Sequence, residues 1–139
     1  MKTHILCLGD SNTHGYCADH GIRFNEDERW TCRLQIALGD KYLVTEEGLS
    51  GRTTVFVDPI HESMDALSVA YPLLKSHEVI DLLIIMLGTN DVKERFGANA
   101  KGVEGGIKLL DQENSSKFGI SGDKGGTHLW WDNADKGNF

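Results

Sequence analysis

The sequence predicts an α/β fold, a three-layer α/β/α sandwich built on a parallel sheet. Its length of 139 residues suits a single domain, which we expect to span residues 1–139. Apolar runs of strand length alternate along the chain with stretches whose apolar residues recur at helical spacing. Each apolar run ends in a cluster of small or polar residues, as buried parallel strands do where they enter a loop. Together these observations favour strands that run in one direction, with helices on both faces.

The first ninety residues supply the elements of this sheet in order. Apolar runs predict strands over residues 3–8, from 42–44 to about 48, and over 79–87. Helical spacing predicts helices over 30–38, ending at Gly39, and over 66–74. Pro72 lies inside the second helix, and we expect it to kink or end that helix because proline lacks a backbone N–H.

The character of the chain changes near Ala98. Residues 101–110 have helical character, but they include three glycines, each of which costs a helix about 1 kcal/mol against alanine. Residues 112–126 are polar and rich in glycine, and residues 127–139 show no clear period. No strand is evident after residue 100, so we expect a sheet of three clear strands that is shortened at its C-terminal end.

Net charge and cysteine content limit the partners and the cellular compartment to be expected. The formal net charge of −7 disfavours nucleic acid and anionic membranes as partners. The longest apolar run, over residues 82–87, is far too short to span a bilayer, and no signal peptide is visible. The three cysteines have no paired spacing, which argues against a disulfide framework: Cys7, Cys17 and Cys32. We therefore expect a cytoplasmic protein that binds neither nucleic acid nor an anionic membrane.

Clusters of small and polar residues follow the three predicted strands, over residues 9–12, 48–53 and 88–91. Because the carboxyl ends of parallel strands meet at one edge of a sheet, these blocks should converge. Their chemistry suits acyl transfer, since Ser11 at a strand-to-helix turn is a candidate nucleophile. The backbone N–H groups of Ser11 and Gly51, with the side-chain amide of Asn90, are candidate donors to an oxyanion.

Each of these residues also has a structural interpretation. Ser11 could cap the first helix, and Gly51 and Asn90 could serve only as turn residues. Asp10 is expected to be a structural hydrogen-bonding group beneath the serine. Arg52 is expected to form a salt bridge or to stand at the rim of a substrate site.

The three blocks resemble those of the SGNH (GDSL-type) serine hydrolases. Residues 9–11, 48–53 and 88–91 match the first, second and third family blocks, and residues 30–31, 46–48 and 84–87 are similar to the arylesterase branch. The resemblance covers about residues 3–100 and leaves 101–139 atypical. It implies a flavodoxin-like fold and serine-dependent hydrolysis of small esters, with Ser11 as nucleophile and Ser11, Gly51 and Asn90 as the oxyanion hole. It implies no cofactor and no metal.

The resemblance also implies a C-terminal Asp-x-x-His that supplies the acid and the base. The literal match, Asp58 to His61, follows the second block, which is the wrong place. His128 stands in a family-like context and is our predicted base, with Asp123, five residues before it, as the orienting acid. If this pair does not serve, the alternative is a catalytically degenerate member that acts as a binding or assembly module.

We also expect a homo-oligomer. In a sheet of three strands, the apolar strand that ends at residue 87 would have an uncovered edge. Such edges tend to pair with another chain. Residues 58–71 resemble the region through which arylesterase-like relatives assemble. The competing expectation is that residues 101–139 fold back over the edge, with Trp130 and Trp131 as the cover.

Overall fold

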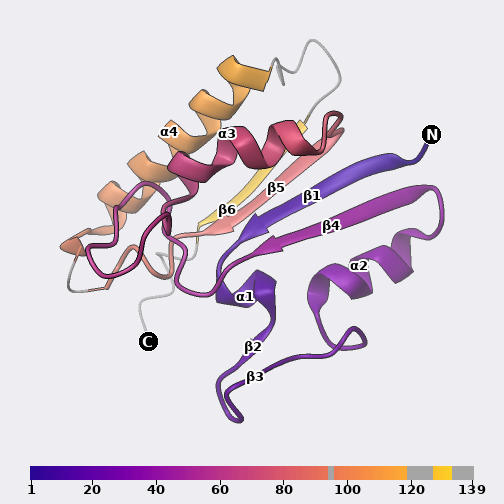
Figure 1. Ribbon diagram of the computed structural model, residues 1–139, viewed down its shortest axis with the longest axis horizontal. Helices are drawn as coiled ribbons and strands as arrows, with labels where there is room; N and C mark the ends of the chain where they lie inside the picture. The colour runs from indigo at the N-terminus through magenta and orange to yellow at the C-terminus, as the bar shows by residue number, and fades with distance from the viewer. Residues whose placement is uncertain (94–95, 119–126, 133–139) are drawn as a thin grey trace.

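The structure, a computed structural model, describes residues 1–93, 96–118 and 127–132. Within these residues the main sheet is parallel and four-stranded, in the order β4-β1-β5-β6 (Figure 1). The strands are β1 (Thr3–Gly9), β4 (Tyr42–Gly48), β5 (Leu82–Leu87) and β6 (Thr127–Asp132). The predicted α/β class and the parallel direction of the strands are confirmed.

Helices cover both faces of this sheet. The helices α3 (Ala66–Ser76) and α4 (Ala100–Phe118) lie side by side on one face, and α2 (Trp30–Leu38) packs along β4 on the other (Figure 1). A single-turn helix, α1 (Ser11–His14), follows β1 directly. A small antiparallel hairpin, β2 (Tyr16–Cys17) with β3 (Ile22–Arg23), then leads towards α2.

The hydrophobic core cluster of the described residues lies between the sheet and the α3/α4 layer. Alternate residues of β5 are fully buried, which is the period-two pattern of a strand with one face on the core. The core cluster consists of Leu6, Leu8, Ala66, Ala70, Leu74, Leu83, Ile85, Leu87 and Leu110. These contacts hold the central strands β1 and β5 against the helices and so give the carboxyl ends of both strands a rigid base.

Most predicted elements of the first ninety residues have the expected position. The helix over 30–38 is observed with the same bounds. Pro72 does not end the helix, because α3 continues through it to Ser76. The strand expected over 79–87 begins only at Leu82, where the pairing of β5 with β1 starts opposite Ile5.

The expectation that no strand follows residue 100 is wrong. Residues 100–118 form one helix, and β6 then pairs in parallel with the whole of β5, from Leu82 opposite Thr127 to Leu87 opposite Asp132. The edge of β5 is therefore covered by the chain itself. Trp130 and Trp131 belong to this covering strand.

Candidate active site

The three polar blocks meet at the carboxyl edge of the sheet, as the parallel register requires. Gly9 at the end of β1 lies opposite Gly48 of β4 and Met86 of β5. The Leu49 N–H donates to the Gly9 carbonyl over 3.1 Å and so fastens the second block to the first. Close packing at this edge leaves no room for side chains, since a Cβ on Gly48 would lie 2.2 Å from the backbone nitrogen of His14.

Ser11 is the first residue of α1, and its side chain is partly exposed. The capping residue is Asp10, whose Oδ1 accepts a hydrogen bond of 2.9 Å from the Asn12 N–H. Helix capping is therefore done by Asp10 and does not account for Ser11. Asp10 is fully buried, and burial raises the pKa of its carboxyl above the usual value, although hydrogen bonds from Asn12 and the charge of Arg52 oppose the shift.

Gly51 lies in a turn that the Arg52 N–H closes with a 3.1 Å hydrogen bond to the Leu49 carbonyl. Its φ of +90° belongs to the left-handed region that side chains disfavour, so glycine suits this position. The Cε atom of Met64 would lie 3.0 Å from a Cβ built on Gly51. The bare backbone of Gly51 thus has Met64 packed close to it.

Asn90 is almost fully buried, at 6% exposure. Its Nδ2 donates to the Arg52 carbonyl over 3.1 Å, so the third block is bonded directly to the second. Asp91 makes a second link, accepting from the Thr54 N–H over 3.0 Å and from the Thr54 hydroxyl. The link between Thr54 and Asp91 was not predicted, because an ordinary Thr and Asp carry no sequence signal of a pairing across 37 positions.

Arg52 does not stand at the rim of a substrate site, which was one of the two positions that the sequence suggested. Its side chain is buried at 7% exposure, and its Nη1 donates to the Gly9 carbonyl over 3.2 Å and to the Glu47 carbonyl over 2.6 Å. Burial lowers the pKa of its guanidinium, although Glu47 and Asp10 oppose that shift. Hydrogen bonds to these carbonyls near the strand ends stabilise the buried side chain. Such backbone partners cannot be recognised from the sequence.

The described structure does not bring His128 to this edge. His128 lies in β6 opposite Leu83, whereas the edge is reached at Asp132, opposite Leu87. Four residues of parallel strand separate these positions, or roughly 13 Å along the sheet. Asp123 lies outside the described residues. Among the histidines whose side chains the structure describes, none is hydrogen-bonded to the Ser11 hydroxyl, and the role of His128 stays a prediction.

The other candidate pair, Asp58 and His61, forms a local contact. The Nδ1 of His61 lies 3.6 Å from Oδ2 of Asp58, and Asp58 Oδ1 also accepts from the Ile60 N–H over 2.8 Å. The His61 side chain is 65% exposed, whereas Asp58 is buried. These contacts lie within one loop, so a loop role accounts for them.

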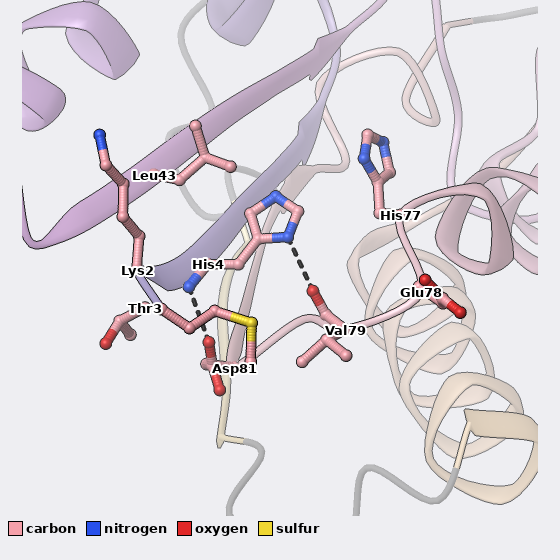
Figure 2. A pocket seen from close by; sticks show the side chains of 9 residues that line it. Lys2, Thr3, His4, Leu43, His77, Glu78, Val79 and Asp81 are labelled. Carbon is pink, nitrogen blue, oxygen red and sulfur yellow. Dashed lines mark hydrogen bonds between the residues drawn. The ribbon is translucent and has the colours of Figure 1, made fainter.

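A pocket of about 480 Å³ lies at the opposite, amino end of the strands, around His4 (Figure 2). The Nδ1 of His4 lies 2.8 Å from the Val79 carbonyl, which can only accept, so Nδ1 carries the proton. Its Nε2 then accepts from the Thr45 hydroxyl over 2.8 Å. Both ring nitrogens are therefore engaged in holding the strand ends together, and His4 has a structural role.

The described residues offer neither a side-chain cluster for a metal ion nor a helix that could span a membrane. No group of three or more His, Cys, Asp or Glu among them could hold a metal ion. No helix among them is long and apolar enough to cross a membrane.

Comparisons with known proteins agree with this geometry. The sequence profile of the GDSL-like Lipase/Acylhydrolase family matches residues 7–117. The chain is similar to Est24, a carbohydrate acetylesterase from Sinorhizobium meliloti, with 34% identity and a TM-score of 0.84 over 93% of this chain and 63% of that one. It is similar to the aryl esterase of M. smegmatis, with 36% identity and a TM-score of 0.83 over 92% of this chain and 62% of that one. The chain thus spans less than two thirds of the length of these relatives. No curated protein sequence matches it significantly.

Proposed function

The chain belongs to the GDSL-like lipase/acylhydrolase family, and from that premise we propose that it hydrolyses small carboxylic esters through an acyl intermediate on Ser11. The observation that carries the proposal is the register of the sheet, which sets Gly9 beside Gly48 and Met86. That register supports the proposal that Ser11, Gly51 with its left-handed backbone and the buried amide of Asn90 act on one substrate.

Ser11 Oγ attacks the ester carbonyl, and the carbonyl oxygen becomes an oxyanion. The backbone N–H groups of Ser11 and Gly51 and the amide of Asn90 donate to that oxyanion. A base takes the serine proton and delivers it to the leaving alcohol, after which water releases the acid by the reverse sequence. The base in this proposal is His128, oriented by Asp123, and neither a metal nor a cofactor is required.

The names of the structural relatives indicate the substrates to try first. One is a carbohydrate acetylesterase and the other an aryl esterase. The proposed substrates are therefore esters with a short acyl group, such as an aryl acetate or an acetylated sugar. Hydrolysis of both should be measured on this chain itself.

The decisive experiment compares Ser11→Ala with Ser76→Ala, an exposed serine at the end of α3. Hydrolysis of an aryl acetate and labelling by a fluorophosphonate should be lost in Ser11→Ala and kept in Ser76→Ala. Both variants should keep the circular dichroism of the parent. Full activity in folded Ser11→Ala would refute the proposal.

A second candidate function is that of a catalytically degenerate member that binds a ligand or a partner. The position of His128 opposite Leu83, away from the edge that holds Ser11, favours this alternative. Comparison of His128→Ala with His61→Ala separates the two. Loss of activity in His128→Ala alone supports the esterase with this base, whereas loss in His61→Ala alone transfers the role to His61. An inactive parent chain supports the binding module.

The proposal includes a cytoplasmic location and self-association. No disulfide joins Cys7, Cys17 or Cys32, which suits a reducing compartment. With β5 covered by β6, the support for a homo-oligomer comes from the loop before α3, where Val57 is 75% and Ile60 is 68% exposed.

A further inference from the structure

Arg52 is a buried cation at the carboxyl edge of the sheet, among the three blocks. Neither the proposed ester hydrolysis nor the α/β fold by itself requires a cation at this place. Its side chain is 7% exposed, while its Nε and the Oδ2 of Asp10 are buried with no hydrogen-bond partner in the described structure. A buried guanidinium is costly unless hydrogen bonds and an opposite charge compensate it. A buried charged group beside a candidate site is itself a candidate for a functional role.

The hydrogen bonds of Arg52 connect all three blocks. Its Nη1 reaches the carbonyl of Gly9, which ends β1, over 3.2 Å and the carbonyl of Glu47, near the end of β4, over 2.6 Å. Its own backbone carbonyl accepts from Asn90 Nδ2 over 3.1 Å. Arg52 is thus bonded to the end of β1, to β4 and to the third block.

The contact with Asn90 determines which way that amide faces. A backbone carbonyl can only accept, so the NH₂ group of Asn90 points to Arg52, and one of its two N–H bonds is used. The second N–H remains available to an oxyanion. The carbonyl that orients Asn90 belongs to Arg52, the residue directly after Gly51, so one short segment carries one oxyanion donor and orients another.

We infer that Arg52 is a positioning residue, whose guanidinium holds the Gly51–Arg52 segment against the ends of β1 and β4 and so sets both oxyanion donors relative to Ser11. This inference rests on the proposed function. It assigns Arg52 no contact with substrate. Misplacing a preorganised donor weakens binding of the transition state more than binding of the substrate, so loss of the guanidinium should act on kcat.

The test uses Arg52→Met, which removes the donors, Arg52→Lys, which restores a cation and a donor, and Arg33→Met, an exposed arginine of α2, as the control. In Arg52→Met, kcat for an aryl acetate and the rate of fluorophosphonate labelling of Ser11 should each fall by roughly 10–100-fold, with KM changed less than about 2-fold. Arg52→Lys should recover part of the loss, and Arg33→Met should match the parent. Equal kcat in folded Arg52→Met and the parent overturns the inference, as does a change confined to KM.

A second measurement does not depend on catalysis. The side-chain amide signals of Asn90, assigned in NMR spectra by their loss in Asn90→Ala, should be protected from exchange in the parent and in Arg33→Met. They should lose that protection in Arg52→Met. If Ser11 is inert in the parent while the Asn90 signals still depend on Arg52, the proposed function fails and the positioning role stands. If the signals are unchanged, the positioning role fails.

Should Arg52→Met not fold, Arg52→Gln takes its place, because it keeps one donor and loses the charge. A kcat and Asn90 protection equal to the parent in both Arg52→Gln and Arg52→Lys would then overturn the inference. Reduced values in both, at unchanged KM, would support it.

Discussion

The Asp10 carboxylate has two different surroundings. One oxygen caps α1 through the Asn12 N–H, and the other is buried without a hydrogen-bond partner in the described structure. Burial therefore dominates and raises the pKa of Asp10 above its ordinary value of 3.8. A group of this kind costs the folded state free energy when it ionises.

Asp10→Asn should reveal that cost as a dependence on pH. From pH 3.8 up to the raised pKa, the folded protein binds more protons at Asp10 than the unfolded chain does, so the free energy of unfolding falls as the pH rises through this window. Asp10→Asn keeps an acceptor for Asn12 and lacks the ionisation. Urea denaturation of both proteins from about pH 3 to pH 7 should show the parent losing stability relative to the variant.

Glu46 has a shift of the opposite sign, but it does not disturb this comparison. Burial raises the pKa of Glu46, yet hydrogen bonds from Arg29, Thr31 and Cys32 outweigh it and leave the pKa below the usual range. Its contribution to stability is lost as the pH falls through that lowered pKa. Since the parent and Asp10→Asn share Glu46, a constant difference between them across the pH range would contradict the prediction for Asp10.

Asn90 offers a prediction about rate. Because its amide is buried and oriented by the Arg52 carbonyl, Asn90→Ala should lower kcat for an aryl ester by roughly 10²–10³ with little change in KM. Asn25→Ala, in an exposed turn of the loop before α2, is the control. A change in KM alone would point to binding of the ground state instead.

At the scale of elements, α4 shows why a helix rich in glycine can form here. A Cβ on Gly106 would lie 2.3 Å from the Thr54 hydroxyl oxygen, and Thr54 is held by Asp91 of the third block. The missing side chain lets α4 approach the loop that carries the second block. Gly105, one residue earlier, is exposed and would meet nothing within 4 Å.

These two neighbours form a matched pair for a test of stability. Gly105→Ala should raise the free energy of unfolding by about 0.5–1 kcal/mol, because alanine favours helix and finds open space. Gly106→Ala should lower it by roughly 1–3 kcal/mol, because the added methyl overpacks against Thr54. Urea denaturation measures both, and equal effects at the two positions would show that the close approach of α4 carries no energetic weight.

At the scale of the whole molecule, the proposed self-association predicts an interface at exposed apolar side chains. Val57 and Ile60 are the most exposed of these in the loop before α3, and Ile36 of α2 is similarly exposed, at 71%. If the loop is the interface, a change there should dissociate the oligomer, whereas a change on α2 should not.

Light scattering across a dilution series tests this prediction. The parent should show a mass above that of one 15.4 kDa chain, Val57→Asp with Ile60→Asp should shift it to the monomer, and Ile36→Asp should not. A parent that stays folded and monomeric at every concentration would refute self-association. The cover that β6 provides for β5 would then account for its solubility as a single chain.

Local pattern by itself determined the central strands, the helices beside them and the three blocks at their ends. The apolar runs of β1 and β5 and the spacing in α2 are carried by near neighbours in sequence, and glycine at a strand end follows from local backbone geometry. The candidate nucleophile Ser11 could be identified from the sequence for the same reason, because its block directly follows a strand.

Contacts between distant residues decided the rest, and no local pattern encodes them. The weakly patterned end of the chain forms β6 because β5 offers it an unpaired edge, and that register sets His128 opposite Leu83. From the sequence alone, Arg52 is expected at the surface, but in the structure its side chain is buried and donates to the carbonyls of Gly9 and Glu47. From the sequence alone, Gly106 is expected to weaken the helix. Its contact with Thr54 explains the glycine, because the free energy of this close approach depends on the packing of both residues.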